Sequence, residues 1–143
     1  MPSGYVYRLP TEAEREYACR AGTTTRLFYG DDLTYAEVGL YAWCAANSGS
    51  YTHPVGQKQA NPWGLYDMIG NAWEWCFDWW GSLPGGKVTD PVGPVGPTWG
   101  HVLKGSDCYQ PGATCRSAHR NPDQPTTQST TIGFRVVLAP ILP

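Results

Sequence analysis

The chain of 143 residues contains few charged side chains and no long apolar run. Charged residues make up 15% of it, whereas an average soluble domain contains about 25%. The formal net charge of −2 provides no excess of positive charge, so we expect neither nucleic acid nor an anionic membrane as a partner. No apolar stretch reaches the roughly 18 residues that a membrane-spanning helix needs, and we therefore expect no such helix.

Signals for secretion, disulfide bonding and structural zinc are also missing. The N-terminal residues lack the charged start and the apolar centre of a signal peptide. We therefore expect a cytoplasmic protein or part of a larger displayed protein, and the sequence leaves the compartment open. The five cysteines are odd in number and include no Cys-x-x-Cys pair, which disfavours a disulfide framework and a zinc site. We expect Cys19, Cys44 and Cys76 to be small buried side chains.

Aromatic residues, by contrast, are concentrated in one part of the chain. The segment from Asn61 to Trp80 holds five of the seven tryptophans, and 17 glycines and 13 prolines are spread along the sequence. Each buried ring removes on the order of 150–250 Å² from water, so rings can build a core where regular elements are scarce. This composition predicts one loop-rich domain over residues 1–143. We expect its core to include Trp73, Trp75, Trp79 and Phe134.

Local patterns predict few regular elements. A helix is expected over residues 9–22, because Thr11 and Glu14 form a capping box and Gly22 follows the last turn. Tyr17 and Ala18 are expected to face the core. Strands are expected over residues 71–80, 101–104 and 133–138, whereas residues 27–41 and the Pro/Gly-rich residues 81–100 are expected to be loops.

Several segments in one order resemble the formylglycine-generating enzyme family, also called the sulfatase-modifying factor family. They are the RLPTEAE segment that ends at Glu14, residues 63–75, and the CRSAHRN and IGFR segments that begin at Cys115 and Ile132. The resemblance implies an α+β fold of the C-type lectin type, with small antiparallel sheets, about two helices and much irregular loop. It also implies a single domain that is shortened at its N-terminus relative to the family. Arg15 stands where the family usually has tryptophan, so we expect the outer face of the first helix to be exposed.

Resemblance to this family raises the question of catalysis. Its oxidases hold copper(I) with two cysteines, because soft thiolates select that ion. Cys108 and Cys115 lie in the corresponding region, but six residues separate them where the family has four, and neither matches a family position. The chain also lacks GxSxG and phosphate-loop motifs. We expect no copper and no catalysis; the alternative is a copper-dependent oxidase that converts sulfatase cysteines to formylglycine.

A related iron-dependent branch of the family uses three histidines. His53, His101 and His119 lack the helical spacing that such a site needs, so we expect no iron chemistry. The resemblance does imply a structural calcium ion near the GNAWEW segment, where oxygen ligands suit a hard cation. Its ligands would come from Asn71, Ala72, Trp73 and Glu74. The alternative, which the residues leave open, is that Glu74 pairs with an arginine and that Asn71 caps a turn.

The stretch from Asp107 to Thr131 consists mostly of small polar residues between strong scaffold motifs. This arrangement resembles the variable proteins of diversity-generating retroelements, in which altered side chains form a ligand-binding face. The resemblance implies a protein or other macromolecular surface as the ligand of a monomeric protein, with the largest contacts from Tyr109 and His119. The alternative is a polar loop without such a role. The predicted face consists of Asp107, Tyr109, Gln110, His119, Pro122, Asp123, Gln124, Thr127, Ser129, Thr130 and Thr131.

Overall fold

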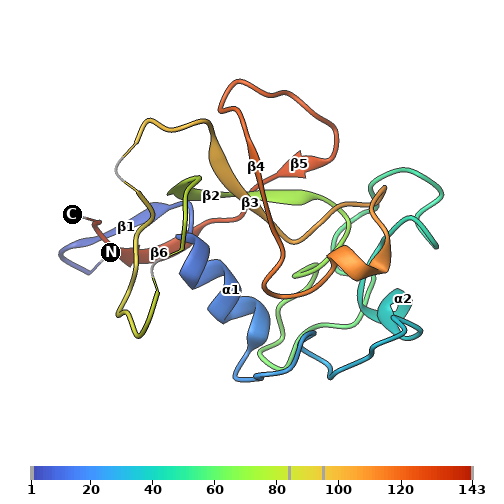
Figure 1. Cartoon of the computed structure of the whole chain (residues 1–143). Helices are drawn as coiled ribbons and strands as arrows, with labels where there is room; N and C mark the ends of the chain where they lie inside the picture. The colour runs from blue at the N-terminus through green and yellow to red at the C-terminus, as the bar shows by residue number, and fades with distance from the viewer. Residues whose placement is uncertain (1, 84, 95, 143) are drawn as a thin grey trace.

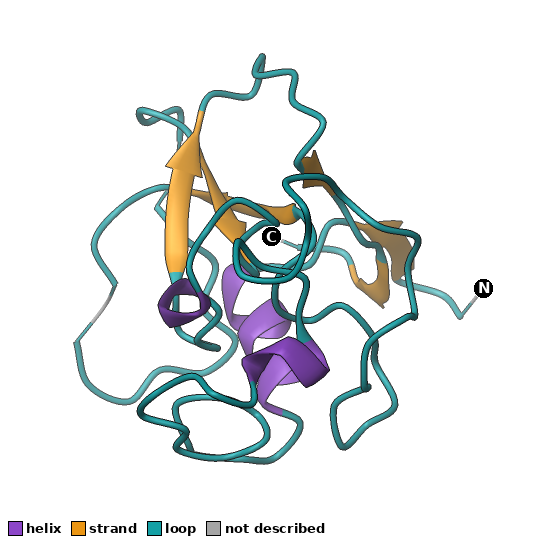
Figure 2. Ribbon diagram, turned by 90° about the vertical axis from the view of Figure 1, so that its right-hand side faces the viewer, coloured by secondary structure: helices purple, strands orange, loops and turns teal. Residues whose placement is uncertain are grey.

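Short strands and helices alternate with long loops in the computed structural model, which describes residues 2–83, 85–94 and 96–142 (Figures 1 and 2). The helical elements are α1 (Glu12–Arg20), α2 (Val38–Tyr41) and the 3₁₀ turn η1 (Gly112–Thr114). The strands are β1 (Tyr5–Arg8), β2 (Trp73–Trp79), β3 (His101–Lys104), β4 (Arg120–Asp123), β5 (Ile132–Gly133) and β6 (Val137–Pro140). The expected α+β fold with two helices, small sheets and much loop is therefore confirmed. No helix within the described ranges is long and apolar enough to span a membrane.

The strands form two small sheets. β1 and β6 pair antiparallel, so segments near the beginning and the end of the chain lie side by side. The larger sheet has the order β4-β3-β2-β5, and β5 runs parallel to β2 while the other neighbours are antiparallel. β4 and β5 therefore lie at opposite edges of this sheet, and the segment that joins them has to cross its end.

Helix α1 begins where the capping box predicts. The hydroxyl of Thr11 accepts from the N–H of Glu14, and the Glu14 carboxylate accepts from the N–H of Thr11. The helix is shorter than expected at both ends and stops at Ala21, which has the left-handed conformation of a C-cap.

The face that α1 buries differs from the expected one. Tyr17 is 66% exposed, and Arg15 is only 2% exposed. The buried stripe consists of Glu12, Arg15 and Cys19, which recur at helical spacing. Two predictions are therefore wrong: Tyr17 does not face the core, and the face that carries Arg15 is not exposed. The physical reason is that Arg15 is neutralised by a buried carboxylate, so the charged side of the helix packs inward.

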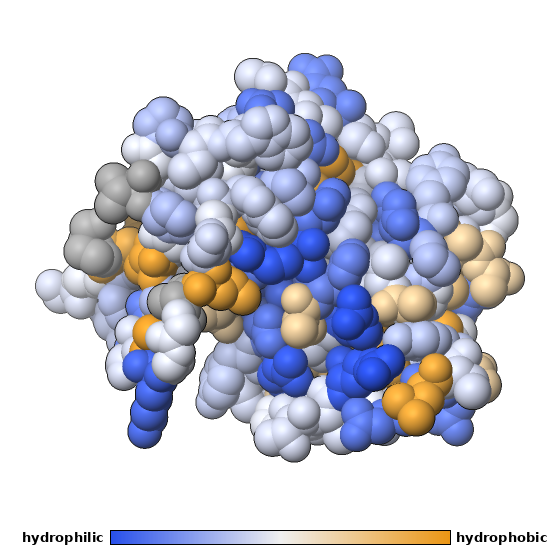
Figure 3. All heavy atoms as spheres, viewed as in Figure 1, coloured by the Kyte–Doolittle hydropathy of each residue, from blue (hydrophilic) through white to orange (hydrophobic). Residues whose placement is uncertain are grey.

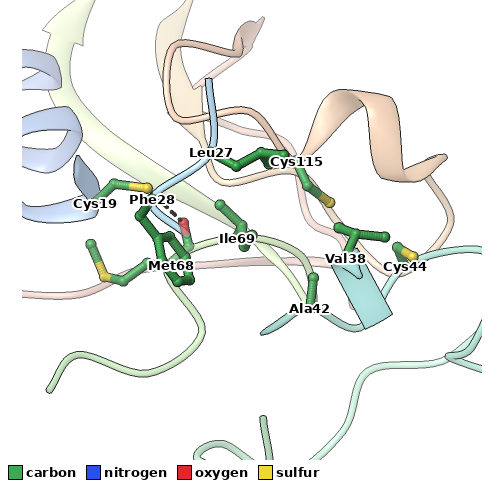
Figure 4. Packing of buried hydrophobic residues seen from close by; sticks show 9 residues of the cluster. All are labelled: Cys19, Leu27, Phe28, Val38, Ala42, Cys44, Met68, Ile69 and Cys115. Carbon is green, nitrogen blue, oxygen red and sulfur yellow. Dashed lines mark hydrogen bonds between the residues drawn. The ribbon is translucent and has the colours of Figure 1, made fainter. Parts of the chain in front are cut away.

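The apolar core is built largely by loop segments and by cysteines (Figure 4). It consists of Cys19, Leu27, Phe28, Val38, Ala42, Cys44, Met68, Ile69 and Cys115, all nearly fully buried. All five cysteines are free and buried, which confirms the expectation for Cys19, Cys44 and Cys76. The segment expected to be a loop over residues 27–41 supplies several of these side chains, and α2 forms at its end.

The tryptophan-rich strand β2 separates a charged layer from an aromatic surface. Glu74, Cys76 and Asp78 are buried, whereas Trp75 and Trp79 are half-buried. Trp73 is buried as expected, but Phe134 is 70% exposed, so its assignment to the core is wrong, and Trp75 and Trp79 are only partly covered. Trp75 and Trp79 lie on the side of β2 that points away from α1, which explains why they are partly exposed. Trp73 lies on the same side, but the ring of His119 packs against it, and Phe134 lies outside the strands.

Ion pairs connect α1 to the inner side of the sheet. Lys104 on β3 is 1% exposed, and its ammonium lies 2.9 Å from a Glu16 carboxylate oxygen. Arg120 on β4 contacts the Glu12 carboxylate at 2.7 Å, and the Asp78 carboxylate accepts from the N–H of Glu12 at 2.6 Å. Burial raises the pKa of Glu12 despite its cationic neighbours, whereas Lys104 and Arg20 outweigh burial and lower the pKa of Glu16.

Two strand predictions need correction. The strand expected over residues 133–138 is divided into β5 and β6, because the chain turns at Phe134–Val136 and directs Arg135 toward Glu74. The polar segment before Thr131, which shows no apolar period, contains β4, whose backbone pairs with β3. The strands expected over residues 71–80 and 101–104 are confirmed as β2 and β3.

Candidate functional site

The outer face of the four-stranded sheet carries a strip of partly exposed rings. Trp75 and Trp79 of β2 point to this side, and His101 of β3 lies opposite Trp79. The His101 ring centroid is 3.9 Å from that of Trp79 and 6.5 Å from that of Trp75. The imidazole is also fixed by a hydrogen bond between its Nδ1 and the carbonyl oxygen of Phe77. The strip, formed by Trp75, Trp79 and His101, is thus rigidly held.

Strand β4 adds polar side chains to the same face. Directly opposite residues of antiparallel strands share a face, and Asp123 lies opposite His101 while Asn121 lies opposite Leu103. Pro122 is paired with the fully buried Val102, which places it on the inner side of the sheet, toward α1. Asn121 is exposed and Asp123 is half-buried, so both are available beside the aromatic strip.

His119 precedes β4, and its ring packs against that of Trp73. Its ring centroid lies 5.5 Å from that of Trp73. Burial, together with the positive charges of Arg116 and Lys104, lowers the pKa of His119. The side chain is therefore a neutral, half-buried ring near neutral pH, and it offers a smaller contact area than the sequence suggests.

Residues 124–131, called the recognition loop below, cross the end of the sheet from β4 to β5. In Figure 1 the loop stands at the top of the molecule, and Figure 3 shows this region as mainly hydrophilic. Its two ends are fixed: the Thr127 hydroxyl donates to the Asp123 carboxylate at 2.6 Å, and the carbonyl oxygen of Thr131 accepts from the N–H of Trp73 at 2.8 Å. The exposed residues between these anchors are Gln124, Pro125, Thr126, Gln128, Ser129 and Thr130.

The eleven predicted face residues differ in accessibility. Tyr109, Gln124, Ser129 and Thr130 are exposed, and Gln110, His119, Pro122, Asp123 and Thr127 are half-buried. Asp107 is 6% exposed and Thr131 is 9% exposed, so these two lie beneath the surface. The Asp107 carboxylate accepts from the N–H groups of Tyr109 and Gln110 at 2.9 and 3.1 Å, which holds the turn that presents Tyr109.

The predicted face is also divided in space. Tyr109 and Gln110 belong to the turn before η1, which lies beside α2 in Figure 1, whereas the recognition loop stands at the top of the molecule. His119, by contrast, lies near the end of the recognition loop, because both His119 and Thr131 contact Trp73. Of the predicted residues, His119, Asp123 and those of the recognition loop thus lie around the outer face. Pro122 lies on the inner side, and the Tyr109 turn forms a separate group.

Sequence reasoning missed an exposed tryptophan next to the recognition loop. Trp99 is 59% exposed, and its carbonyl oxygen accepts a hydrogen bond from the side-chain amide of Gln124. The available signal was weak: a single tryptophan between a Pro/Gly-rich loop and a strand. Large rigid rings beside small polar residues are typical of protein-recognition surfaces.

The residues expected to bind calcium make contacts within the protein. The Asn71 side chain accepts from the N–H of His53 at 2.8 Å and donates to the His53 carbonyl oxygen at 3.1 Å. The Glu74 carboxylate accepts from Arg15 at 2.7 Å and from two nitrogens of Arg135 at 2.6 and 2.7 Å. Burial opposes ionisation of Glu74, but the two guanidinium groups outweigh it and lower its pKa. This is the alternative arrangement that the sequence left open.

A hollow of about 540 Å³ lies beside these residues and is lined in part by Asp67, Asn71, Ala72, Glu74 and Arg135. The Asp67 carboxylate already accepts from the N–H of Gly56 at 2.7 Å. Within the described part of the chain, no group of three or more His, Cys, Asp or Glu side chains is arranged to hold a metal ion. The side-chain oxygens of Asp67, Asn71 and Glu74 thus accept from donors within the protein, and these engaged side chains do not fit a calcium site that is built on them.

The two cysteines in the region of the family's copper pair are buried. Burial, with the charge of Asp107, raises the pKa of the Cys108 thiol. Burial raises the pKa of the Cys115 thiol to about 12. Cys115 belongs to the apolar core together with Cys19 and Cys44. Both thiols are therefore mainly protonated near neutral pH.

Comparison with known proteins places the fold and the motifs in one family. Residues 3–140 match the family model described as a sulfatase-modifying factor enzyme 1-like domain. The formylglycine-generating enzyme of Mus musculus is 37% identical over 143 residues, covering 90% of this chain and 38% of that protein. The serine/threonine-protein kinase pkn1 of Chlamydia caviae is 37% identical over 141 residues, covering 93% of this chain and 22% of that protein.

Solved structures with the same fold include proteins of different names. Treponema denticola variable protein 1 has a TM-score of 0.82 and 39% identity, covering 91% of this chain and 46% of that one. PvdO from Pseudomonas aeruginosa has a TM-score of 0.83 and 32% identity, covering 95% of this chain and 54% of that one. The chain thus spans about half or less of the length of each of these proteins.

Proposed function

The chain belongs to the sulfatase-modifying factor enzyme 1-like family, and we propose that within this family it is a non-catalytic protein that binds a macromolecular ligand. The observation that carries the proposal is the outer face of the sheet. There a hydrophilic recognition loop, fixed at both ends, borders a rigid strip of rings and the exposed Trp99. Loops held by a rigid scaffold are well suited to recognition, because their side chains can change without disturbing the core.

The likeness to a variable protein supports this proposal. Treponema denticola variable protein 1 is more similar in sequence than PvdO, at 39% against 32% identity. In this chain, the exposed Ser and Thr residues of the recognition loop would provide adaptable hydrogen bonds. Trp99, beside the loop, would provide a large contact with little loss of side-chain entropy, and Tyr109 would provide another on its separate turn. A protein surface, bound by a single copy of this chain, is the ligand that this chemistry suits.

Family membership does not by itself imply an oxidase. The same domain matches enzymes named for formylglycine generation and part of a protein named as a kinase. In this chain, the buried Cys108 and Cys115 have raised thiol pKa values, which favours a role in packing. We therefore assign no catalytic residue.

Selection from a displayed library tests the binding function. The library would vary the exposed loop positions Gln124, Thr126, Gln128, Ser129 and Thr130, and a matched library would vary five exposed positions elsewhere on the surface. We expect specific protein binders from the loop library, and we expect Trp99→Ala to weaken them at least about tenfold, as interface tryptophans commonly do. Equal success with the matched library, or binders that are indifferent to Trp99→Ala, would contradict the proposed face.

Gene context provides a second test of the variable-protein assignment. We expect a reverse transcriptase gene nearby, with a near-copy of the codons for residues 104–135 that differs at adenines. If no such copy exists, the diversification is refuted, whereas the binding face would still be decided by the library experiment.

The second candidate function is a copper-dependent formylglycine-generating oxidase, favoured by the 37% identity to the mouse enzyme. Titration with copper(I) distinguishes the two functions. We expect no tight one-to-one complex and no aldehyde in a cysteine peptide from a sulfatase after incubation with copper and oxygen. Tight binding that is lost in both Cys108→Ser and Cys115→Ser would establish the oxidase instead.

A further inference from the structure

We propose that the buried guanidinium of Arg15 takes the place of a metal cation beside Glu74, so that the fold of this chain is independent of calcium. The inference concerns the predicted calcium residues, Asn71 to Glu74, and does not rest on the proposed binding function.

Arg15 reaches Glu74 from α1 through the interior of the molecule. Its side chain is only 1% exposed, and its Nε lies 2.7 Å from Oε2 of Glu74. A second nitrogen of the same guanidinium donates to the carbonyl oxygen of Met68 at 2.9 Å. Arg15 is therefore held by two partners in a place that solvent scarcely reaches.

Arg135, which lies between β5 and β6, binds the same carboxylate. Its Nε donates to Oε2 of Glu74 at 2.6 Å, and a terminal nitrogen donates to Oε1 at 2.7 Å. This bidentate pairing uses both oxygens of Glu74 in the geometry that arginine favours. Each carboxylate oxygen thus already accepts at least one charged donor.

Charge balance argues against a further cation. Glu74 contributes one negative charge, and Arg15 and Arg135 contribute two positive charges within hydrogen-bond distance of it. Calcium would add two more positive charges and requires about 6–8 oxygen ligands at roughly 2.3–2.6 Å. The side-chain oxygen of Asn71 already accepts from the N–H of His53, so the side-chain oxygens of both Asn71 and Glu74 are engaged within the protein.

The clamp formed by Arg15, Glu74 and Arg135 joins three parts of the chain. It connects α1, β2 and the turn that follows β5, and Arg135 also donates to the carbonyl oxygens of Tyr66 and Asp67. β5 pairs with β2 at Trp73 and Glu74, immediately after the recognition loop ends at Thr131. The guanidinium groups therefore fix the C-terminal anchor of that loop without a metal.

Thermal unfolding with and without calcium tests the inference. We expect the same Tm for the wild-type chain in EDTA and in excess calcium chloride. We expect Arg15→Met to lower the Tm clearly more than Arg26→Met, since Arg26 is exposed and does not contact Glu74. Isothermal titration with calcium chloride should give no saturable heat for the wild-type chain.

Two results would overturn the inference. One is a saturable calcium-induced rise of several degrees in the wild-type Tm, which a cation that binds the folded state would produce. The other is an Arg15→Met variant as stable as Arg26→Met, which would show that the guanidinium has no stabilising role. If Arg15→Met does not fold, Arg15→Lys replaces it, and we expect this charge-conserving variant to fold with an intermediate Tm and no response to calcium.

Discussion

At the scale of single residues, Asp107 and Gln124 show that two polar residues of one predicted face can have different roles. The Asp107 carboxylate holds a turn by accepting from two backbone N–H groups, whereas Gln124 is exposed beside Trp99. We predict that Asp107→Ala lowers the free energy of unfolding by about 1–3 kcal/mol, because two partly buried N–H donors lose their carboxylate acceptor. Gln124→Ala should change it by no more than about 0.5 kcal/mol.

Urea denaturation followed by tryptophan fluorescence measures both effects, and Asp107→Asn is the matched control because it keeps an acceptor oxygen. An Asp107→Ala variant with wild-type stability would mean that the carboxylate is dispensable for the turn and is free to contact a ligand.

Ionisation of the Glu74 carboxyl group makes the stability of the fold depend on pH. Its pKa in the folded chain lies below the ordinary value of 4.5, because Arg15 and Arg135 outweigh the effect of burial. The contribution of Glu74 to stability is therefore present above pH 4.5 and is lost as the pH falls through the folded pKa. We predict that Glu74→Gln has a shallower loss of stability below pH 4.5 than the wild-type chain.

The comparison requires both proteins at each pH, since the pKa of Glu12 is raised by burial and acts in the opposite sense. Chemical denaturation at several pH values provides the measurement. Parallel curves for wild type and Glu74→Gln would show that the Glu74 pKa is not lowered by folding.

At the scale of elements, the Pro/Gly-rich segment after β2 is fixed to the sheet at particular glycines. The N–H of Gly93 donates to the Asp78 carboxylate at 2.7 Å, and a Cβ at Gly93 would lie 2.8 Å from the Asp78 Cβ and 3.0 Å from the Trp79 carbonyl oxygen. A Cβ added at Gly85 would have no such neighbour within 4 Å. We predict that Gly93→Ala destabilises the fold by about 1–3 kcal/mol through overpacking, whereas Gly85→Ala is neutral or slightly stabilising.

Thermal unfolding of the two variants gives the comparison, and a red shift of tryptophan emission in folded Gly93→Ala would report that Trp79 has become more exposed. Equal Tm values for the two variants would mean that the segment can move away from Asp78 at no cost.

The sequence predicted those helices and strands whose signals come from residues that are close together in the chain. The capping box located α1, and alternation located β2, because both signals depend on neighbouring residues. The buried face of α1 was not predictable from apolar periodicity, because Arg15 is buried by pairing with Glu74, which is 59 residues away. β4 was missed for a similar reason: its residues are polar, and its backbone partner β3 defines it as a strand.

The residues of the candidate site were likewise predicted only in part. The exposed residues Gln124, Ser129 and Thr130 lie where the polar composition indicated, since a polar loop between two strands is forced to the surface. Trp99 was missed because its exposure depends on the end of the Pro/Gly-rich segment, which no period describes. The burial of Thr131 results from its pairing with Trp73, a tertiary contact that composition cannot reveal.

At the scale of the whole molecule, the structure consists of an apolar core among loops, a charged layer between α1 and the sheet, and an aromatic outer face. The five cysteines lie on the inner side of this arrangement, and each is at most 2% exposed. A copper oxidase of the family's kind needs a thiolate pair that reaches metal and substrate, whereas a binding scaffold needs only that its thiols stay buried.

Thiol labelling therefore connects the architecture to the function. We predict that all five cysteines of the native chain react with a thiol reagent at least about a thousandfold more slowly than in guanidinium, because labelling requires global opening. The rates should rise together as denaturant is added, and peptide mapping by mass spectrometry would follow each cysteine. Fast native-state labelling confined to Cys108 and Cys115 would instead identify an accessible pair and favour the oxidase. The experiment needs neither the ligand nor copper, because it distinguishes the two functions by the accessibility of the thiols in the folded chain.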